Sequence, residues 1–236
     1  MDLTSTPRKI PRTIPRTDAL VSPQSALLAG TDQSSSPIIR APIVLGVMAS
    51  GSGSNFEAIA EAISKGVLNA RIAVVIYNNP QAKVAQRAQR LGIPAVLLDH
   101  RQFSSRESLD DAIAAQLMEY QVNWVIMAGW MRRVTERLLS AFPRRILNIH
   151  PSLLPSFPGI RSVEQALNAG VKITGCSVHF VELVIDSGPI IMQAAVPVAP
   201  DDTVETLQAR IQVQEHRIFP AAIALAAQQV SHPTAS

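Results

Sequence analysis

Three polar side chains in the second half of the sequence could together carry out acid–base chemistry at a carbonyl carbon. Asn148 and His150 stand two residues apart in the run LNIHP (147–151), so in an extended strand both face the same side. An asparagine amide can donate to a developing oxyanion, and a histidine exchanges protons near neutral pH. Asp186, in the turn DSGP (186–189), could stabilise a charged imidazole and hold an attacking water or amine, or serve only as a turn residue.

A second candidate site is the loop SGSGSN (50–55), which lies between an apolar run and a helical pattern. Glycines allow close approach to an anion, and a helix N-terminus offers free N–H groups and a positive dipole end. A dinucleotide-binding fingerprint requires glycine where Phe56 stands, and a P-loop requires a lysine that this loop lacks. The loop therefore suits a phosphate on a simpler molecule, and the alternative is a Gly-rich turn with an ordinary serine cap.

Two further residues fall on opposite faces of the apolar run 173–182. Cys176 is expected in the core, whereas His179 either supports the site or is an interior histidine. One cysteine cannot form an internal disulfide, and no cluster of histidine, cysteine and aspartate has metal-ligand spacing. The sequence also lacks a nucleophile elbow, so we expect a metal-free acid–base mechanism with an external nucleophile.

These residues need a scaffold, and the hydrophobic pattern predicts one from residue 43 onward. Short apolar runs alternate with helical patterns, which is typical of parallel βαβ units. We expect strands at 43–49, 71–77, 94–98, 124–129 and 145–149, and helices at 54–65, 81–91 and roughly 105–120. Longer runs at 173–182 and 189–198 predict a hairpin-like strand pair, and a long helix follows at roughly 203–229. The expected fold is α/β, with an open doubly wound, mostly parallel sheet and flanking helices. Its ligand crevice should lie beyond the carboxyl ends of the strands.

Composition divides the 236-residue chain into three parts. Residues 1–42 are rich in Pro, Ser, Thr and Arg, and are expected to form a disordered extension or, alternatively, an organelle-targeting segment. Residues 43–230 form the expected domain, and 231–236 a flexible tail. We see no basic stripe for nucleic acid and no stretch long enough to span a membrane. We therefore expect a cytoplasmic monomer or homodimer with small-molecule partners.

Several segments together resemble the folate-dependent formyltransferase family, and within it the phosphoribosylglycinamide formyltransferases. They are SGSGSN (50–55), AGWMR (128–132), NIHPSLLP (148–155), SVHFV (177–181), DSGP (186–189) and QVQEH (212–216). The resemblance covers about 43–229. The run NIHPSLLP with the later aspartate is specific for folate-dependent formyl transfer, and the Gly-Ser-Asn loop narrows it to the glycinamide ribonucleotide branch.

The resemblance implies direct transfer of the formyl group of 10-formyltetrahydrofolate to the amine of glycinamide ribonucleotide, in purine biosynthesis and without a metal. It implies that Asn148 contacts the formyl oxygen, that His150 is the general acid, and that Asp186 stabilises the charged imidazole. The residues implied to bind the substrate are Gly53, Ser54, Asn55, Gln212 and Glu215. The residues implied to bind the folate are Arg106, Met131, Arg132, Arg133, Val134 and Asn148.

Two segments depart from the family pattern. Bacterial relatives often carry a histidine in the segment that here reads IRSVE (160–164), and the segment ELVI (182–185) is more apolar than the acidic version expected. Substrate and folate contacts from these segments stay open.

Three alternative functions can be stated. Formyltetrahydrofolate deformylase resembles this core but carries a folded regulatory domain in front, where this sequence has about 42 residues of extension. Methionyl-tRNA formyltransferase needs a C-terminal RNA-binding domain for which no residues remain. A non-catalytic sugar-phosphate binding module would keep the 50–55 loop without needing Asn148, His150 and Asp186 together.

Overall fold

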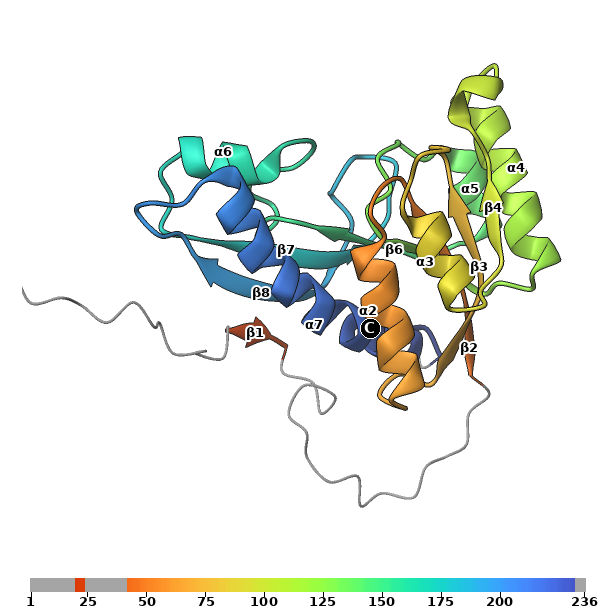
Figure 1. Cartoon of the computed structure of the whole chain (residues 1–236), viewed down its shortest axis with the longest axis horizontal. Coiled ribbons are helices and arrows are strands. Elements are labelled where there is room, and N and C mark those ends of the chain that lie inside the picture. Colours follow the sequence, from red (N-terminus) through yellow and green to blue (C-terminus); the bar gives the residue numbers. More distant parts are fainter. Residues whose placement is uncertain (1–19, 24–41, 232–236) are drawn as a thin grey trace, which may run out of the picture.

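A single mixed sheet organises the computed structural model, which describes residues 20–23 and 42–231 (Figure 1). Its strands are β1 (Val21–Ser22), β2 (Ile43–Ala49), β3 (Ala70–Tyr77), β4 (Ala95–Leu97), β5 (Trp124–Met127), β6 (Ile146–His150), β7 (Ile173–Phe180) and β8 (Ile190–Pro197). The helices are α2 (Ser54–Ser64), α3 (Val84–Arg90), the 3-10 turn η1 (His100–Gln102), α4 (Arg106–Glu119), α5 (Glu136–Ala141), α6 (Ser162–Asn168) and α7 (Val204–Ser231).

The strand order is β1-β8-β7-β6-β5-β2-β3-β4. The five strands from β6 to β4 run parallel, as alternating strands and helices predict. β7 pairs antiparallel with β6, and β8 antiparallel with β7, so the expected hairpin-like pair is present. The prediction of an α/β fold with a doubly wound, mostly parallel sheet is confirmed.

The sheet is buried on both faces, which explains why its central strands are continuous apolar runs. Helices α2, α3 and α7 contribute to the core on one face, and α4 and α5 to the core on the other. Side chains of β2 alternate between the two, with Val47 in the first core and Met48 in the second. This packing fixes the positions of the carboxyl ends of the strands, where the candidate site residues lie.

Four elements were not predicted. The helices α5 and α6 have six and seven residues, and η1 has three, so each offers at most about two turns in which a helical hydrophobic period can repeat. The strand β1 lies within the expected disordered extension, yet it pairs antiparallel with β8 through Val21↔Ala194 and Ser22↔Gln193. The extension is therefore ordered at residues 20–23, and its other residues up to 41 lie outside the described part of the chain.

The described part of the chain ends with the long helix α7. The expected tail 231–236 lies outside the described residues except for Ser231, which ends α7. Among the helices that the structure describes, none is long and apolar enough to cross a membrane.

Candidate active site

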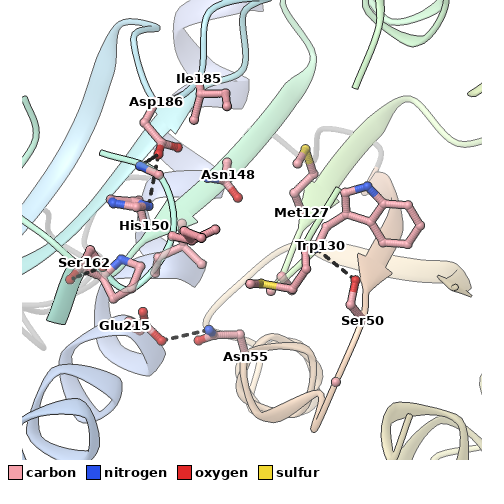
Figure 2. Close-up of a pocket in the computed structure, with 18 of the residues that line it drawn as sticks. Ser50, Asn55, Met127, Trp130, Asn148, His150, Ser162, Ile185, Asp186 and Glu215 are labelled. Atoms are coloured by element: carbon pink, nitrogen blue, oxygen red, sulfur yellow. Dashed lines mark hydrogen bonds and ion pairs between the residues drawn. The ribbon is translucent and has the colours of Figure 1, made fainter. Parts of the chain in front are cut away.

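A cavity of about 570 Å³ opens beyond the carboxyl ends of β2, β5 and β6 (Figure 2). Its walls come from the loops after these three strands, from the segments 159–164 and 179–186, and from the first half of α7. The cavity thus lies where an open parallel sheet is expected to bind its ligand. It contains Asn148, His150 and Asp186 together with the whole 50–55 loop.

His150 and Asp186 form a buried pair at the end of β6. His150 Nδ1 lies 3.3 Å from Asp186 Oδ2, and their side chains are 7% and 8% exposed. His150 Nε2 lies 2.9 Å from the carbonyl oxygen of Phe157 and therefore donates to it, since a carbonyl only accepts. Both ring nitrogens thus face acceptors. Only the imidazolium form supplies a proton to each of them.

Asp186 is itself held in place by its surroundings. The N–H of Gly159 donates to Asp186 Oδ2 at 2.7 Å. Burial works against ionisation of this carboxyl group, but the hydrogen bond with His179, the Gly159 N–H and the charges of His150 and His179 outweigh it, so the pKa of Asp186 is lowered. The carboxylate is therefore charged at neutral pH and faces the imidazole as an anion.

His179, whose role the sequence left open, lies inside the site. It pairs with Asn148 across the β6–β7 ladder, so the two side chains are neighbours. His179 Nδ1 donates to the Phe180 carbonyl at 2.7 Å, and its Nε2 lies 3.2 Å from Asn148 Nδ2 and 3.6 Å from Asp186 Oδ1. A predicted antiparallel pairing of β7 with β6 could have identified His179 as a site residue. The register of that pairing puts His179 beside Asn148, which the spacing of residues within β7 does not reveal.

The 50–55 loop joins β2 to the N-terminus of α2. Gly53 has a φ of 75°, in the left-handed region that glycine adopts without strain, and it forms the N-cap of α2. The helix α7 closes this end of the cavity through two bonds. Gln212 Nε2 donates to Ser54 Oγ at 2.8 Å, and Asn55 Nδ2 donates to Glu215 Oε2 at 3.0 Å. The five residues predicted to bind substrate are therefore brought together.

Glu215 is 4% exposed, and Figure 2 shows its carboxyl group meeting Asn55. Burial raises the pKa of Glu215, and the hydrogen bond from Asn55 offsets this only in part. A carboxyl group whose pKa is raised by folding makes its full contribution to the free energy of unfolding only when the pH is below the ordinary glutamate pKa. That contribution is lost as pH rises through the raised value.

Replacing Glu215 with glutamine is therefore expected to make the free energy of unfolding less sensitive to alkaline pH. The variant resembles protonated Glu215, so at about pH 4 the two proteins should differ little. Towards about pH 8 the free energy of unfolding of the variant should exceed that of the wild type. The excess should be about 1.4 kcal/mol for each pH unit by which folding raises the pKa of Glu215. Urea denaturation at several pH values measures the difference, and a constant difference across that range would contradict the assignment.

The residues predicted to bind folate are only partly brought together. Met131, Arg132, Arg133 and Val134 line the cavity after β5, and the Met131 N–H donates to Ser50 Oγ at 2.9 Å. Asp110 Oδ2 accepts from the Thr135 N–H at 2.6 Å and so anchors this segment to α4. Arg106 does not line the cavity and is the exposed first residue of α4.

Other lining residues were missed or left open by sequence reasoning. Trp130, which is 6% exposed, lines the cavity beside Met127 (Figure 2), although only its neighbours were predicted. Both departing segments also reach the cavity: Ile160 and Leu183 line it and are 72% and 52% exposed. These two segments therefore add exposed apolar side chains to the cavity wall, next to the charged Arg161, Glu164 and Glu182.

Comparisons with known proteins identify the group to which these features correspond. The formyl transferase family model matches residues 44–223. Phosphoribosylglycinamide formyltransferase of Bacillus subtilis is 42% identical over 75% of this chain and 91% of that protein. The trifunctional purine biosynthetic protein adenosine-3 of Gallus gallus is 43% identical over 78% of this chain. The match spans only 18% of that larger protein.

Solved structures agree with the sequence matches. Glycinamide ribonucleotide transformylase 1 from Symbiobacterium toebii superposes with a TM-score of 0.79 and 48% identity, covering 83% of this chain and 93% of that one. Phosphoribosylglycinamide formyltransferase from Bacillus halodurans superposes with a TM-score of 0.75 and 44% identity, covering 79% and 95%.

Proposed function

The chain belongs to the formyl transferase family, and we propose on this basis that it transfers the formyl group of 10-formyltetrahydrofolate to the amine of glycinamide ribonucleotide, a step of purine biosynthesis. One observation carries the proposal: a helix N-terminus suited to a phosphate and an Asn148–His150–Asp186 cluster share one cavity. A substrate with a phosphate at one end and an amine at the other would connect the two.

The proposed reaction is a direct transfer. The amine of the nucleotide attacks the formyl carbon of the folate, and the carbonyl oxygen becomes an oxyanion. The oxyanion then returns to a carbonyl as the C–N bond to the folate breaks, the folate nitrogen takes a proton from His150, and tetrahydrofolate leaves. The incoming amine then loses its extra proton to the His150 ring, which has just given one up, or to water, so protons balance. Most of the rate enhancement then comes from positioning and charge stabilisation.

His150 is the proposed proton donor. Its Nδ1 faces the Asp186 carboxylate, and its Nε2–H, which the Phe157 carbonyl accepts in the structure, is the proton that it would transfer to the folate nitrogen. Asp186, charged at neutral pH because its pKa is lowered, acts through the imidazole.

Asn148 is the proposed oxyanion donor. His179 Nδ1 donates to the Phe180 carbonyl, which fixes the ring, and its Nε2 lies 3.2 Å from Asn148 Nδ2, so the ring holds the amide in place. An amide nitrogen carries two hydrogens, so an N–H of Asn148 would be free to donate to the formyl oxygen. His179 thus supports the proposed role by fixing the amide.

The substrate's other end is proposed to lie against α2 and α7. The N–H groups at the start of α2, with Gly53, Ser54 and Asn55, would hold the phosphate. Glu215 and Gln212, which already contact the loop, would meet the ribose or amine end. The segment Met131–Val134 and the neighbouring apolar wall would hold the folate.

An absorbance assay of folate turnover, with and without glycinamide ribonucleotide, tests the proposal. We expect turnover of 10-formyltetrahydrofolate only when the amine is present. Turnover without the amine would indicate a hydrolase such as a deformylase. No turnover in either case would indicate a sugar-phosphate binding module, and both results would refute formyl transfer to this amine.

A further inference from the structure

The 50–55 loop is attached to α3 by its backbone carbonyl groups. Gly51 carbonyl oxygen accepts from the Val84 N–H at 3.2 Å, and Ser52 carbonyl oxygen accepts from Arg87 Nε at 2.8 Å. Val84 also packs so closely that a Cβ on Gly53 would lie 2.7 Å from the Val84 Cβ. The loop is thus held from behind by one helix, on the side away from the cavity.

This attachment determines where the N–H groups of the loop point. In a trans peptide the C=O of one residue and the N–H of the next point in opposite directions. Because the carbonyls of Gly51 and Ser52 turn toward α3, the N–H groups of Ser52 and Gly53 turn away from it. Within residues 42–231 neither N–H has a hydrogen-bond partner, and both residues line the cavity. They are therefore available to an anion.

Arg87 also forms an ion pair with the Glu57 carboxylate, whose negative charge would otherwise repel a bound anion. Glu57 lies in the first turn of α2, close to where the phosphate is proposed to bind. Arg87 and Arg90 both form ion pairs with the Glu57 carboxylate. Arg90 Nη2 pairs with Glu57, whereas Arg87 pairs with Glu57 and also donates to the Ser52 carbonyl in the loop before α2.

We propose that Arg87, which does not itself line the cavity, is a positioning residue for the phosphate group of the substrate. Its bond to the Ser52 carbonyl fixes the Ser52–Gly53 peptide with its N–H toward the phosphate. The nature of the substrate rests on the proposed function, but the prepared anion site rests on the loop geometry alone.

The test compares Arg87→Met with the matched control Arg90→Met. Loss of the Arg87 bond should raise KM for glycinamide ribonucleotide about 10- to 100-fold, as expected when a charge-assisted hydrogen bond is removed. The kcat and the KM for folate should stay within about threefold, which also shows that the variant is folded. Arg90→Met, which removes an exposed ion pair, should change all three values by less than about threefold.

A third variant separates charge from geometry. Arg87→Lys keeps a positive charge near Glu57 but lacks the planar Nε–H that faces Ser52. We expect its KM for the phosphorylated substrate to resemble that of Arg87→Met. Full recovery of the wild-type KM by lysine would overturn the proposal, because charge alone would then suffice.

Calorimetric titration with inorganic phosphate makes the result independent of the reaction. We expect the wild type and Arg90→Met to bind phosphate and Arg87→Met to bind it at least about tenfold more weakly. Phosphate binding without formyl transfer would refute the proposed function and leave this inference standing. Equal phosphate affinity in Arg87→Met and the wild type, or no binding by either, would overturn the inference whatever the activity.

Discussion

Replacing His150 with alanine is expected to lower kcat by about 100- to 10,000-fold, the range typical for loss of a general acid or base. The His150 imidazole faces a carboxylate at one ring nitrogen and a carbonyl at the other, and alanine leaves no group at this position to hold a proton. Substrate affinity should survive, because the proposed phosphate and folate contacts come from other segments. KM values should therefore stay within a few-fold of the wild type.

Steady-state kinetics with both substrates varied measures this effect. His100→Ala is the matched control, because His100 contacts Asn78 outside the cavity, and its removal should leave kcat near the wild-type value. A His150→Ala enzyme that turns over at close to the normal rate would show that the proton comes from another group or from water.

Replacing Asp186 with asparagine is expected to lower kcat by about 100-fold at or above neutral pH, because the charge that stabilises the imidazolium is lost. Asparagine keeps the size of the side chain and can still accept from the Gly159 N–H, so the loop should stay in place. The deficit should persist as pH falls from neutral towards the ordinary aspartate pKa, because the charge that the variant lacks is still present there in the wild type. The wild-type carboxylate stays ionised over this range, since its pKa is lowered.

A profile of kcat against pH for both enzymes tests this expectation. Asp202→Asn is the matched control, because Asp202 is similarly buried but pairs with Arg210 and does not line the cavity. It should lower the free energy of unfolding and leave kcat and its pH dependence unchanged. An Asp186→Asn enzyme with close to the wild-type kcat at neutral pH would show that turnover does not need the charge of Asp186.

The parts of the fold that sequence patterns predicted are those with strong, local signals. The strand expected at 43–49 has those bounds in the structure, because a fully buried parallel strand is a continuous apolar run that ends at a glycine turn. The helices α5 and α6 carry no such signal. Their start and end depend on capping and on backbone turns, such as the positive φ of Arg161.

The candidate site shows the same division. Asn148, His150 and the 50–55 loop could be placed because each directly follows or ends a predictable strand. Asp186 reaches the site because of the course that the chain takes between β7 and β8. The sequence does not predict that course, so the contact between Asp186 and His150 could only be assumed before the structure showed it. Arg106 was carried over from the family and does not line the cavity. The sequence does not predict a role for Arg87, because its partner is a backbone carbonyl, and every residue type has one.

The short strand β1 has a further consequence for the whole molecule. Without it β8 would be the outermost strand of that side of the sheet, with its outward N–H and C=O groups unpaired. Such an edge is a template on which another chain can add a strand. Two residues are too few to bind there on their own, but tethering to the same polypeptide keeps them at a high local concentration. The family match begins at residue 44, after β1. The segment before the family match thus occupies the edge of β8 at Gln193 and Ala194, two positions that a strand added from another chain would have to use.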